Sequence, residues 1–151
     1  MKARRTKHTF CRVVLPLALL LSGAVSSYCQ QKVVVPGPKN LPYSDGIVVG
    51  NTLYIAGQTG EDESRRIINR GIGPETQRAL ENLAKVVKAA GFKLTDVVSV
   101  TVYLADLNEF EAMNKVYRGF MPDPKPARTT VQVVRLVDDA RVEISAIAVK
   151  Q

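Results

Sequence analysis

The sequence contains no tryptophan, one histidine and two cysteines, and the scarcity of the last two types excludes several kinds of chemistry. His8, Cys11 and Cys29 all lie within the first 30 residues. Residues 31–151 therefore cannot form a Ser-His-Asp or Cys-His nucleophile system, nor a zinc site built from histidine and cysteine. The chain also lacks the P-loop and the glycine motif that binds dinucleotides. Any catalysis must rely on carboxylates, arginines, hydroxyls and backbone groups.

An excess of positive charge is also absent once the first 30 residues are set apart. The whole chain has a formal net charge of +7. Residues 1–30 hold five of the 21 Lys and Arg residues and no acidic residue, which leaves 16 basic against 14 acidic residues, or +2. So small a charge gives no electrostatic basis for binding nucleic acid. The length of 151 residues and the hydrophobic content of 46% are typical of one folded domain.

Residues 1–29 have the order of regions that characterises a secretory signal peptide. A basic start precedes an apolar run over 13–21, and small residues follow over 22–27. The apolar run is shorter than the roughly 20 residues that span a bilayer. We expect cleavage between residues 26 and 29 and an exported protein, periplasmic or extracellular, without stable membrane association. An uncleaved membrane anchor and lipidation of Cys29 are the alternatives.

Residues 30–151 predict a single domain in which strands and helices alternate. Runs rich in β-branched residues predict strands, and apolar residues at helical spacing predict helices. The expected elements are strands at 31–35, 45–50 and 53–58, a helix from Pro74 to Gly91, a strand at 97–104, a helix from Asp106 to the prolines at 122, 124 and 126, and strands at 129–136 and 141–149. This order predicts an α+β fold with two helices on one face of a mixed sheet.

The last two strands are expected to form a hairpin around Asp138-Asp139. In that hairpin Val134 faces Glu143, and Arg128 lies six residues farther along the strand. At about 3.3 Å per residue, roughly 20 Å separates Arg128 from Glu143. The two residues can then share a site only if they come from different chains.

Several short motifs between Pro36 and the C-terminus occur in a specific order and spacing. They are Leu-Pro-Tyr ending at Tyr43, Leu53 to Gln58, Ala89 to Phe92, Val102 to Asn108, Met113-Asn114, Pro126 to Thr129, and Val142 to Ala148. Together they make the chain similar to the Rid family of enamine/imine deaminases, also called the YjgF family. The resemblance implies a chorismate-mutase-like α+β fold, a homotrimer, sites in clefts between subunits, and chemistry without a metal or cofactor.

The resemblance also assigns roles to individual residues. Arg128 is expected to bind the substrate carboxylate, because a planar guanidinium holds a carboxylate through two parallel hydrogen bonds. Glu143 is expected to hold the attacking water and accept its proton. The residues expected to line the pocket are Tyr43, Asn114 and, through backbone groups, Gly57 and Thr130. From the residues alone, ordinary alternatives stay open: Arg128 could form a surface ion pair, Glu143 could pair with Arg141 or Arg135, Tyr43 could serve packing, and Asn114 could bond a loop backbone.

Two residues depart from the family pattern. Ala56 stands where the family commonly has a serine, whose hydroxyl helps to bind or protonate the substrate, and Thr130 stands where it commonly has a cysteine. We predict hydrolysis of a 2-imino acid of the 2-iminobutanoate or 2-iminopropanoate type, or of its enamine tautomer, to a 2-oxo acid and ammonia. The alternative is a non-catalytic exported trimer that binds small carboxylates or acts as a holdase-like chaperone. Ribonuclease activity fits least well, because residues 31–151 lack histidine and carry little net charge.

Overall fold

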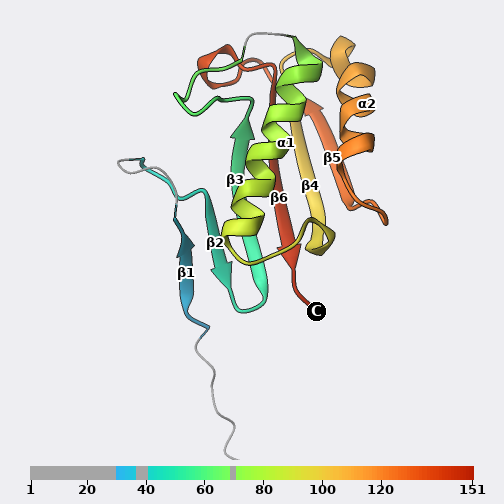
Figure 1. Cartoon of the computed structure of the whole chain (residues 1–151). Coiled ribbons are helices and arrows are strands. Elements are labelled where there is room, and N and C mark those ends of the chain that lie inside the picture. Colours follow the sequence, from blue (N-terminus) through green and yellow to red (C-terminus); the bar gives the residue numbers. More distant parts are fainter. Residues whose placement is uncertain (1–29, 37–40, 69–70) are drawn as a thin grey trace, which may run out of the picture.

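Strands and helices alternate along the chain in the predicted order (Figure 1). The computed structural model describes residues 30–36, 41–68 and 71–151, so the expected signal peptide lies outside the described residues. The elements are β1 (Lys32–Val35), β2 (Gly46–Val49), β3 (Thr52–Thr59), α1 (Ile72–Ala89), β4 (Val97–Leu104), α2 (Phe110–Phe120), β5 (Ala127–Gln132) and β6 (Val142–Val149). Within these described ranges, no helix is long and apolar enough to cross a membrane.

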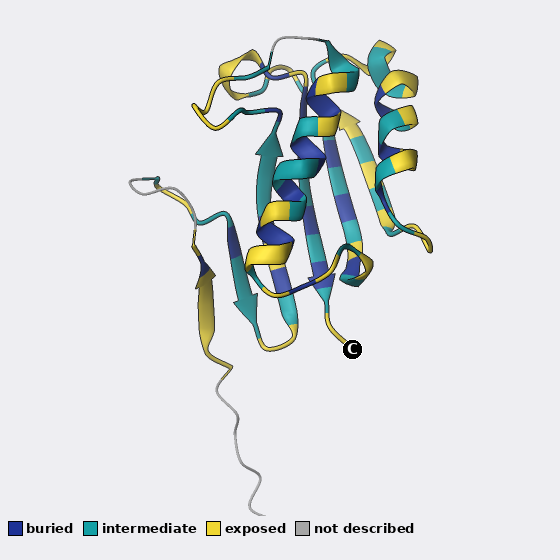
Figure 2. Cartoon of the chain, in the orientation of Figure 1, coloured by how far each residue is buried: buried dark blue, intermediate teal, exposed yellow. Residues whose placement is uncertain are grey.

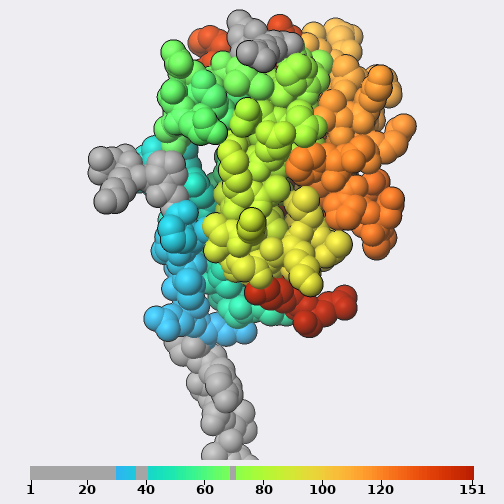
Figure 3. Space-filling view, viewed as in Figure 1, coloured from blue at the N-terminus to red at the C-terminus, as the bar shows by residue number. Residues whose placement is uncertain are grey.

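The strands form one six-stranded sheet in the order β1-β2-β3-β6-β4-β5. The β4–β5 pair is parallel, and the other pairs are antiparallel, so the sheet is mixed. Both helices lie on the same face of the sheet (Figure 1), α1 packing over β3 and β6 and contacting α2 at its side. The space-filling view of this face shows the two helices next to each other (Figure 3). The predicted α+β architecture, with two helices on one face of a mixed sheet, is confirmed.

The predicted hairpin between the last two strands is wrong. β5 pairs in parallel with β4 at the edge of the sheet, whereas β6 lies between β3 and β4. The burial patterns of β5 and β6 suit different positions in the sheet. In β6, buried residues alternate with half-buried ones, which fits an interior strand, whereas β5 is largely exposed and polar, which fits an edge. The connection turns through Asp138 and Asp139, whose φ angles are 53° and 55°, and carries the chain past β4.

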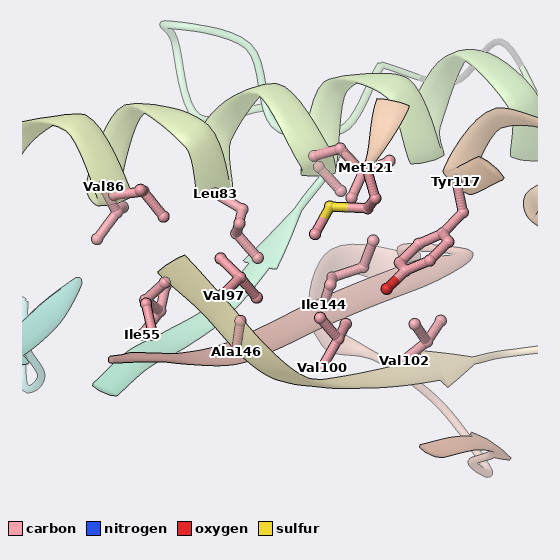
Figure 4. Packing of buried hydrophobic residues seen from close by; sticks show 14 of the residues in the cluster. Ile55, Leu83, Val86, Val97, Val100, Val102, Tyr117, Met121, Ile144 and Ala146 are labelled. Carbon is pink, nitrogen blue, oxygen red and sulfur yellow. The ribbon is translucent and has the colours of Figure 1, made fainter. Parts of the chain in front are cut away.

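The hydrophobic core lies between the helices and the sheet (Figure 2). Figure 4 shows Leu83 and Val86 pointing from α1 toward the sheet, and Tyr117 pointing inward from α2. The largest fully buried apolar residues are Leu53, Leu80, Leu83, Leu104, Met113, Ile144, Val87, Val100, Val102 and Val142. On the opposite face of the sheet, alternate residues remain partly exposed, and this face is called the open face below.

α1 begins at Ile72, two residues before Pro74, and its first turn carries a buried carboxylate. A proline is tolerated in a first turn because no backbone N–H is needed there. The side chain of Glu75 is only 1% exposed, and its Oε1 accepts the backbone N–H of Arg141 at 2.6 Å. Burial raises the pKa of Glu75, against the lowering effect of that hydrogen bond. Glu75 thereby ties the start of α1 to the start of β6.

Candidate active site

A cleft of about 490 Å³ opens between β3, the middle of α1 and the loops that precede β2 and follow β3. Three of the predicted site residues line it, namely Tyr43, Gly57 and Glu143. Arg128, Asn114 and Thr130 do not line it. The structure therefore brings together half of the predicted site within one chain.

The carboxylate of Glu143 lies directly against Gly57. A Cβ atom placed on Gly57 would collide with Glu143 Oε1 and would lie 2.8 Å from its Cγ. The missing side chain at position 57 therefore makes room for the carboxylate. Burial raises the pKa of Glu143, because partial removal from water penalises the ionised form.

Glu143 forms no ion pair with either arginine considered from the sequence. Arg135 binds Asp139 through two hydrogen bonds of 2.6 and 3.0 Å, and Arg141 binds Glu109. Within the described residues, no cationic group lies within salt-bridge distance of Glu143. Its carboxylate is thus partly desolvated and uncompensated, a combination common among general bases.

Arg65 also lines this cleft, although nothing in the sequence predicted it. Its Nη2 donates to the hydroxyl oxygen of Tyr43 at 3.2 Å and lies 3.4 Å from Glu61 Oε2. The hydrogen bond to Tyr43 and the nearby carboxylate of Glu61 raise the pKa of Arg65. Arg65 belongs to a polar loop in which no local pattern distinguishes it from neighbouring charges, so the contact with Tyr43 emerges only when the loop is folded.

The loop from Gly60 to Ile68 is held by hydrogen bonds at its tip and its base. At the tip, the carboxylate of Asp62 accepts the backbone N–H groups of Ser64 and Arg66 at 2.8 and 3.1 Å. At the base, the side-chain amide of Asn82 donates to the carbonyls of Thr59 and Glu61 at 3.1 and 3.0 Å. These bonds anchor the loop to α1 and fix the position of the backbone that carries Arg65.

Arg128 lies on the helix side of β5, where it stacks on aromatic rings. Its guanidinium carbon is 4.5 Å from the ring centroid of Tyr117 and 5.8 Å from that of Phe110. Within the described part of the chain, no carboxylate lies within salt-bridge distance of it. The surface ion pair considered from the sequence is therefore absent there. Stacking supports the guanidinium through its face and leaves its N–H groups free at the edge.

Thr130 and Asn114 lie near this second location. Thr130 points to the same side of β5 as Arg128, and its hydroxyl is buried without a hydrogen-bond partner in the described residues. Asn114 is half-buried on α2, one turn before Tyr117. The predicted residues are thus divided between a carboxylate-bearing group around Glu143 and a guanidinium-bearing group around Arg128.

The register of the sheet places Arg128 and Glu143 on opposite faces. Arg128 is paired with Val100 of β4, whereas Glu143 is paired with Tyr103 of the same strand. Side chains alternate along a strand, so positions three residues apart point to opposite faces. Two strand spacings and three residues along β4 separate their Cα atoms by roughly 14 Å. The 20 Å derived from the hairpin was wrong, but one chain still does not bring the two side chains into one cleft.

Residues 36–150 match the family described as Endoribonuclease L-PSP. The chain belongs to this family, which is the YjgF/Rid family. Among its Rid relatives, a RutC family protein of Pyrococcus horikoshii is 46% identical over 111 residues, which cover 73% of this chain and 88% of the relative. The human 2-iminobutanoate/2-iminopropanoate deaminase is 40% identical over 110 residues, which cover 72% of this chain and 80% of the relative.

Solved Rid structures have the same fold. A putative endoribonuclease of Thermotoga maritima superimposes with a TM-score of 0.77 at 38% identity, covering 80% of this chain and 99% of the other. TdcF of E. coli, solved with bound serine, superimposes with a TM-score of 0.70 at 34% identity, covering 74% and 90%. The chain is thus a Rid protein with relatives named as imine deaminases, alongside others named for the RutC family or as putative endoribonucleases.

Proposed function

We propose that the protein hydrolyses 2-imino acids, or their enamine tautomers, to 2-oxo acids and ammonia. In this proposal Glu143 of one subunit orients and deprotonates the attacking water, and Arg128 of a neighbouring subunit binds the substrate carboxylate. The observation that carries the proposal is the environment of Glu143. This carboxylate lies in a cleft, against a glycine that leaves room for it, with burial that raises its pKa and no cation paired to it in the described residues.

The chemistry required of Glu143 is that of a general base. Water adds to the imine carbon as Glu143 accepts one of its protons, and the resulting carbinolamine then releases ammonia to give the 2-oxo acid. A carboxylate with a raised pKa is a stronger base than an ordinary surface glutamate. No step needs a metal, and the described residues contain no group of three or more His, Cys, Asp or Glu side chains placed to hold one.

The environment of Arg128 supports its role as the carboxylate clamp. Tyr117 and Phe110 limit the positions of the guanidinium, which reduces the entropy lost when it grips a substrate. The clamp lies on the edge strand β5, where a second subunit can approach without displacing another strand. The backbone of Thr130, two residues farther along this edge, is a further donor for the substrate, and Asn114 is close enough on α2 to line the same half of the site.

A homotrimer is the assembly that we propose for this site. The open face of the sheet carries exposed apolar residues on three strands, Tyr54 on β3, Val98 on β4 and Val131 on β5. Apolar surface of this kind favours association between subunits. A closed ring with the same contact repeated at each interface would bring the Arg128 half of one subunit to the Glu143 half of the next. Three such interfaces would form three equivalent sites.

A non-catalytic role is the second candidate, and the residue that favours it is Ala56. Ala56 lines the cleft beside Gly57 and supplies a methyl group where a hydroxyl could have bound or protonated a substrate. A trimer that binds small carboxylates without turning them over would need Arg128 but not the basicity of Glu143, and a holdase would not need that basicity either.

Ammonia release from freshly generated 2-iminobutanoate tests the proposed function. The wild-type protein should exceed the uncatalysed rate, and Arg128→Ala should fall to that rate while retaining its fold by circular dichroism. Arg118→Ala is the matched control, because Arg118 is an exposed arginine on α2 without a side-chain ion pair in the described residues. Equal rates for the wild type, Arg128→Ala and the blank would exclude the deaminase and leave the non-catalytic role.

A further inference from the structure

The hydroxyl of Tyr43 differs from the other neutral donors that line the cleft. Tyr43 is 49% exposed, and its oxygen accepts a hydrogen bond from Arg65, so its own proton has no acceptor in the described residues. The other neutral side chains in the cleft already donate within the protein: Gln58 gives one of its two N–H groups to the carbonyl of Ala56, Thr59 donates to Glu61, and Asn82 donates to the carbonyls of Thr59 and Glu61. Tyr43 can therefore donate its proton to a molecule in the cleft.

The backbone conformation at Arg65 does not favour an arginine, so the turn itself does not explain the presence of this side chain. The N–H of Arg65 donates to the carbonyl of Asp62 at 3.0 Å, which closes a turn over 62–65. Arg65 itself has a φ of 59°, in the left-handed region that glycine or asparagine adopts most easily at the end of such a turn. A non-glycine residue held in this conformation is strained, and such strain is often retained where a side chain has a function.

We propose that Arg65 is a positioning residue for Tyr43, and that Tyr43 donates the proton that the imine nitrogen receives during hydrolysis. This inference rests on the proposed deaminase function. By donating to the hydroxyl oxygen, Arg65 fixes the phenol and leaves its O–H directed away from the guanidinium. The guanidinium also lies beside the oxygen on which negative charge develops when the proton leaves, which lowers the energy of that step.

The protons balance in this scheme. As water adds to the imine carbon, Glu143 takes one proton from the water and Tyr43 gives one to the nitrogen, so that a neutral carbinolamine forms. Glu143 then returns its proton to Tyr43 through solvent. In the second step the nitrogen gains a proton, the carbinol hydroxyl loses one and the C–N bond breaks. The sum is imine plus water to 2-oxo acid plus ammonia.

The test is a double-mutant cycle with Arg65→Gly and Tyr43→Phe, assayed as ammonia release from 2-iminobutanoate. Glycine relieves the strained backbone, so Arg65→Gly should melt at or above the wild-type temperature. Its kcat should nevertheless fall about tenfold, the effect of losing one well-placed hydrogen bond, with little change in KM. Tyr43→Phe should fall at least as far, and the double variant should fall no further than Tyr43→Phe. Arg66→Ala, which removes the neighbouring charge, is the matched control and should retain wild-type kinetics.

Two results would contradict the inference directly. Wild-type kcat in Arg65→Gly, or additive losses in the double variant, would show that Arg65 does not act through Tyr43. If Arg65→Gly melts lower than the wild type, Arg65→Asn is measured instead, and retained kcat in that variant overturns the proposal. If the wild type releases no ammonia, the proposed function fails, and binding of 2-oxobutanoate by calorimetry decides the role of Arg65. In a protein that only binds, the hydroxyl of Tyr43 would donate to the bound 2-oxo acid itself, so about tenfold weaker binding in both Arg65→Gly and Tyr43→Phe supports that role, and unchanged binding overturns it.

Discussion

Mixing two inactive variants tests most directly whether the site is shared between chains. Arg128→Ala lacks the proposed clamp but keeps Glu143, and Glu143→Ala lacks the proposed base but keeps Arg128. Each variant alone should be inactive in every assembly it forms. Because the two side chains point to opposite faces of the sheet, roughly 14 Å apart at their Cα atoms, complementary halves can meet only across an interface.

The expected recovery of activity follows from the random choice of subunits at each interface. When the variants are denatured together in equal amounts and refolded, each interface draws its two subunits at random. A site is intact only if the Arg128 half comes from a Glu143→Ala subunit and the Glu143 half comes from an Arg128→Ala subunit. This holds for about one interface in four, so the mixture should recover about a quarter of the wild-type rate per subunit, whatever the size of the closed ring.

Ammonia release before and after co-refolding is the assay, with size-exclusion chromatography to follow assembly. Wild-type protein taken through the same procedure corrects for losses in refolding, and each variant refolded alone gives the baseline. Recovery at the baseline, with normal assembly, would show that both residues act within one chain or that they do not share a site. An active monomer would refute the reasoning as well.

Four further predictions concern three single residues and the N-terminal segment. Arg128→Lys keeps the charge but loses the two-pronged geometry, so kcat/KM should fall about a hundredfold, or ~2–3 kcal/mol, with an unchanged melting temperature; unimpaired kinetics would show that Arg128 is not the clamp. Glu143→Gln should lose turnover but melt at a higher temperature than the wild type at pH 7, because the folded state disfavours the ionised form of Glu143. This difference in melting temperature should vanish as the pH falls below the usual glutamate range. The acid limb of the wild-type pH–rate profile should lie above that range. Glu75→Gln keeps an acceptor for the N–H of Arg141 and should be at least as stable as the wild type to urea, whereas Glu75→Ala should lose about 2–4 kcal/mol; similar losses in both variants would contradict this. Protein recovered outside the cytoplasm should lack residues 1–25 by mass spectrometry, and an intact N-terminus would leave only the membrane-anchor interpretation.

Local patterns were sufficient for most of the fold. Gly91, with a φ of 75°, ends α1 as its position after the apolar periodicity predicted, and the run at 97–104 is β4. The prediction of a hairpin around Asp138-Asp139 was wrong because turn residues show where the chain bends but not which strand the next segment pairs with. The alternation of buried residues in β6 suits an interior strand, and that preference separates it from β5.

The sequence predicted which residues belong to the candidate site, but not how they are placed relative to one another. Nothing in the local sequence around Arg128 and Glu143 shows that they face opposite sides of the sheet, because that relation depends on the register of both strands with β4. Gly57 was expected to line the pocket through its backbone, and nothing in the sequence indicated that its missing side chain also makes room for the Glu143 carboxylate. Arg65 was missed because its contact with Tyr43 joins two loops 22 residues apart in the chain.

The packing of Glu143 against Gly57 has a consequence for which substitutions the chain can tolerate. Glycine inside a strand weakens it, so replacement of Gly57 would ordinarily be neutral or favourable for folding. Here every other side chain would occupy the space of the carboxylate, and natural variation should therefore be far narrower at position 57 than strand stability requires. Gly119 offers the contrast, since a Cβ atom there meets nothing within 4 Å and alanine favours a helix. Saturation mutagenesis scored for turnover should find Gly57 intolerant and Gly119 permissive.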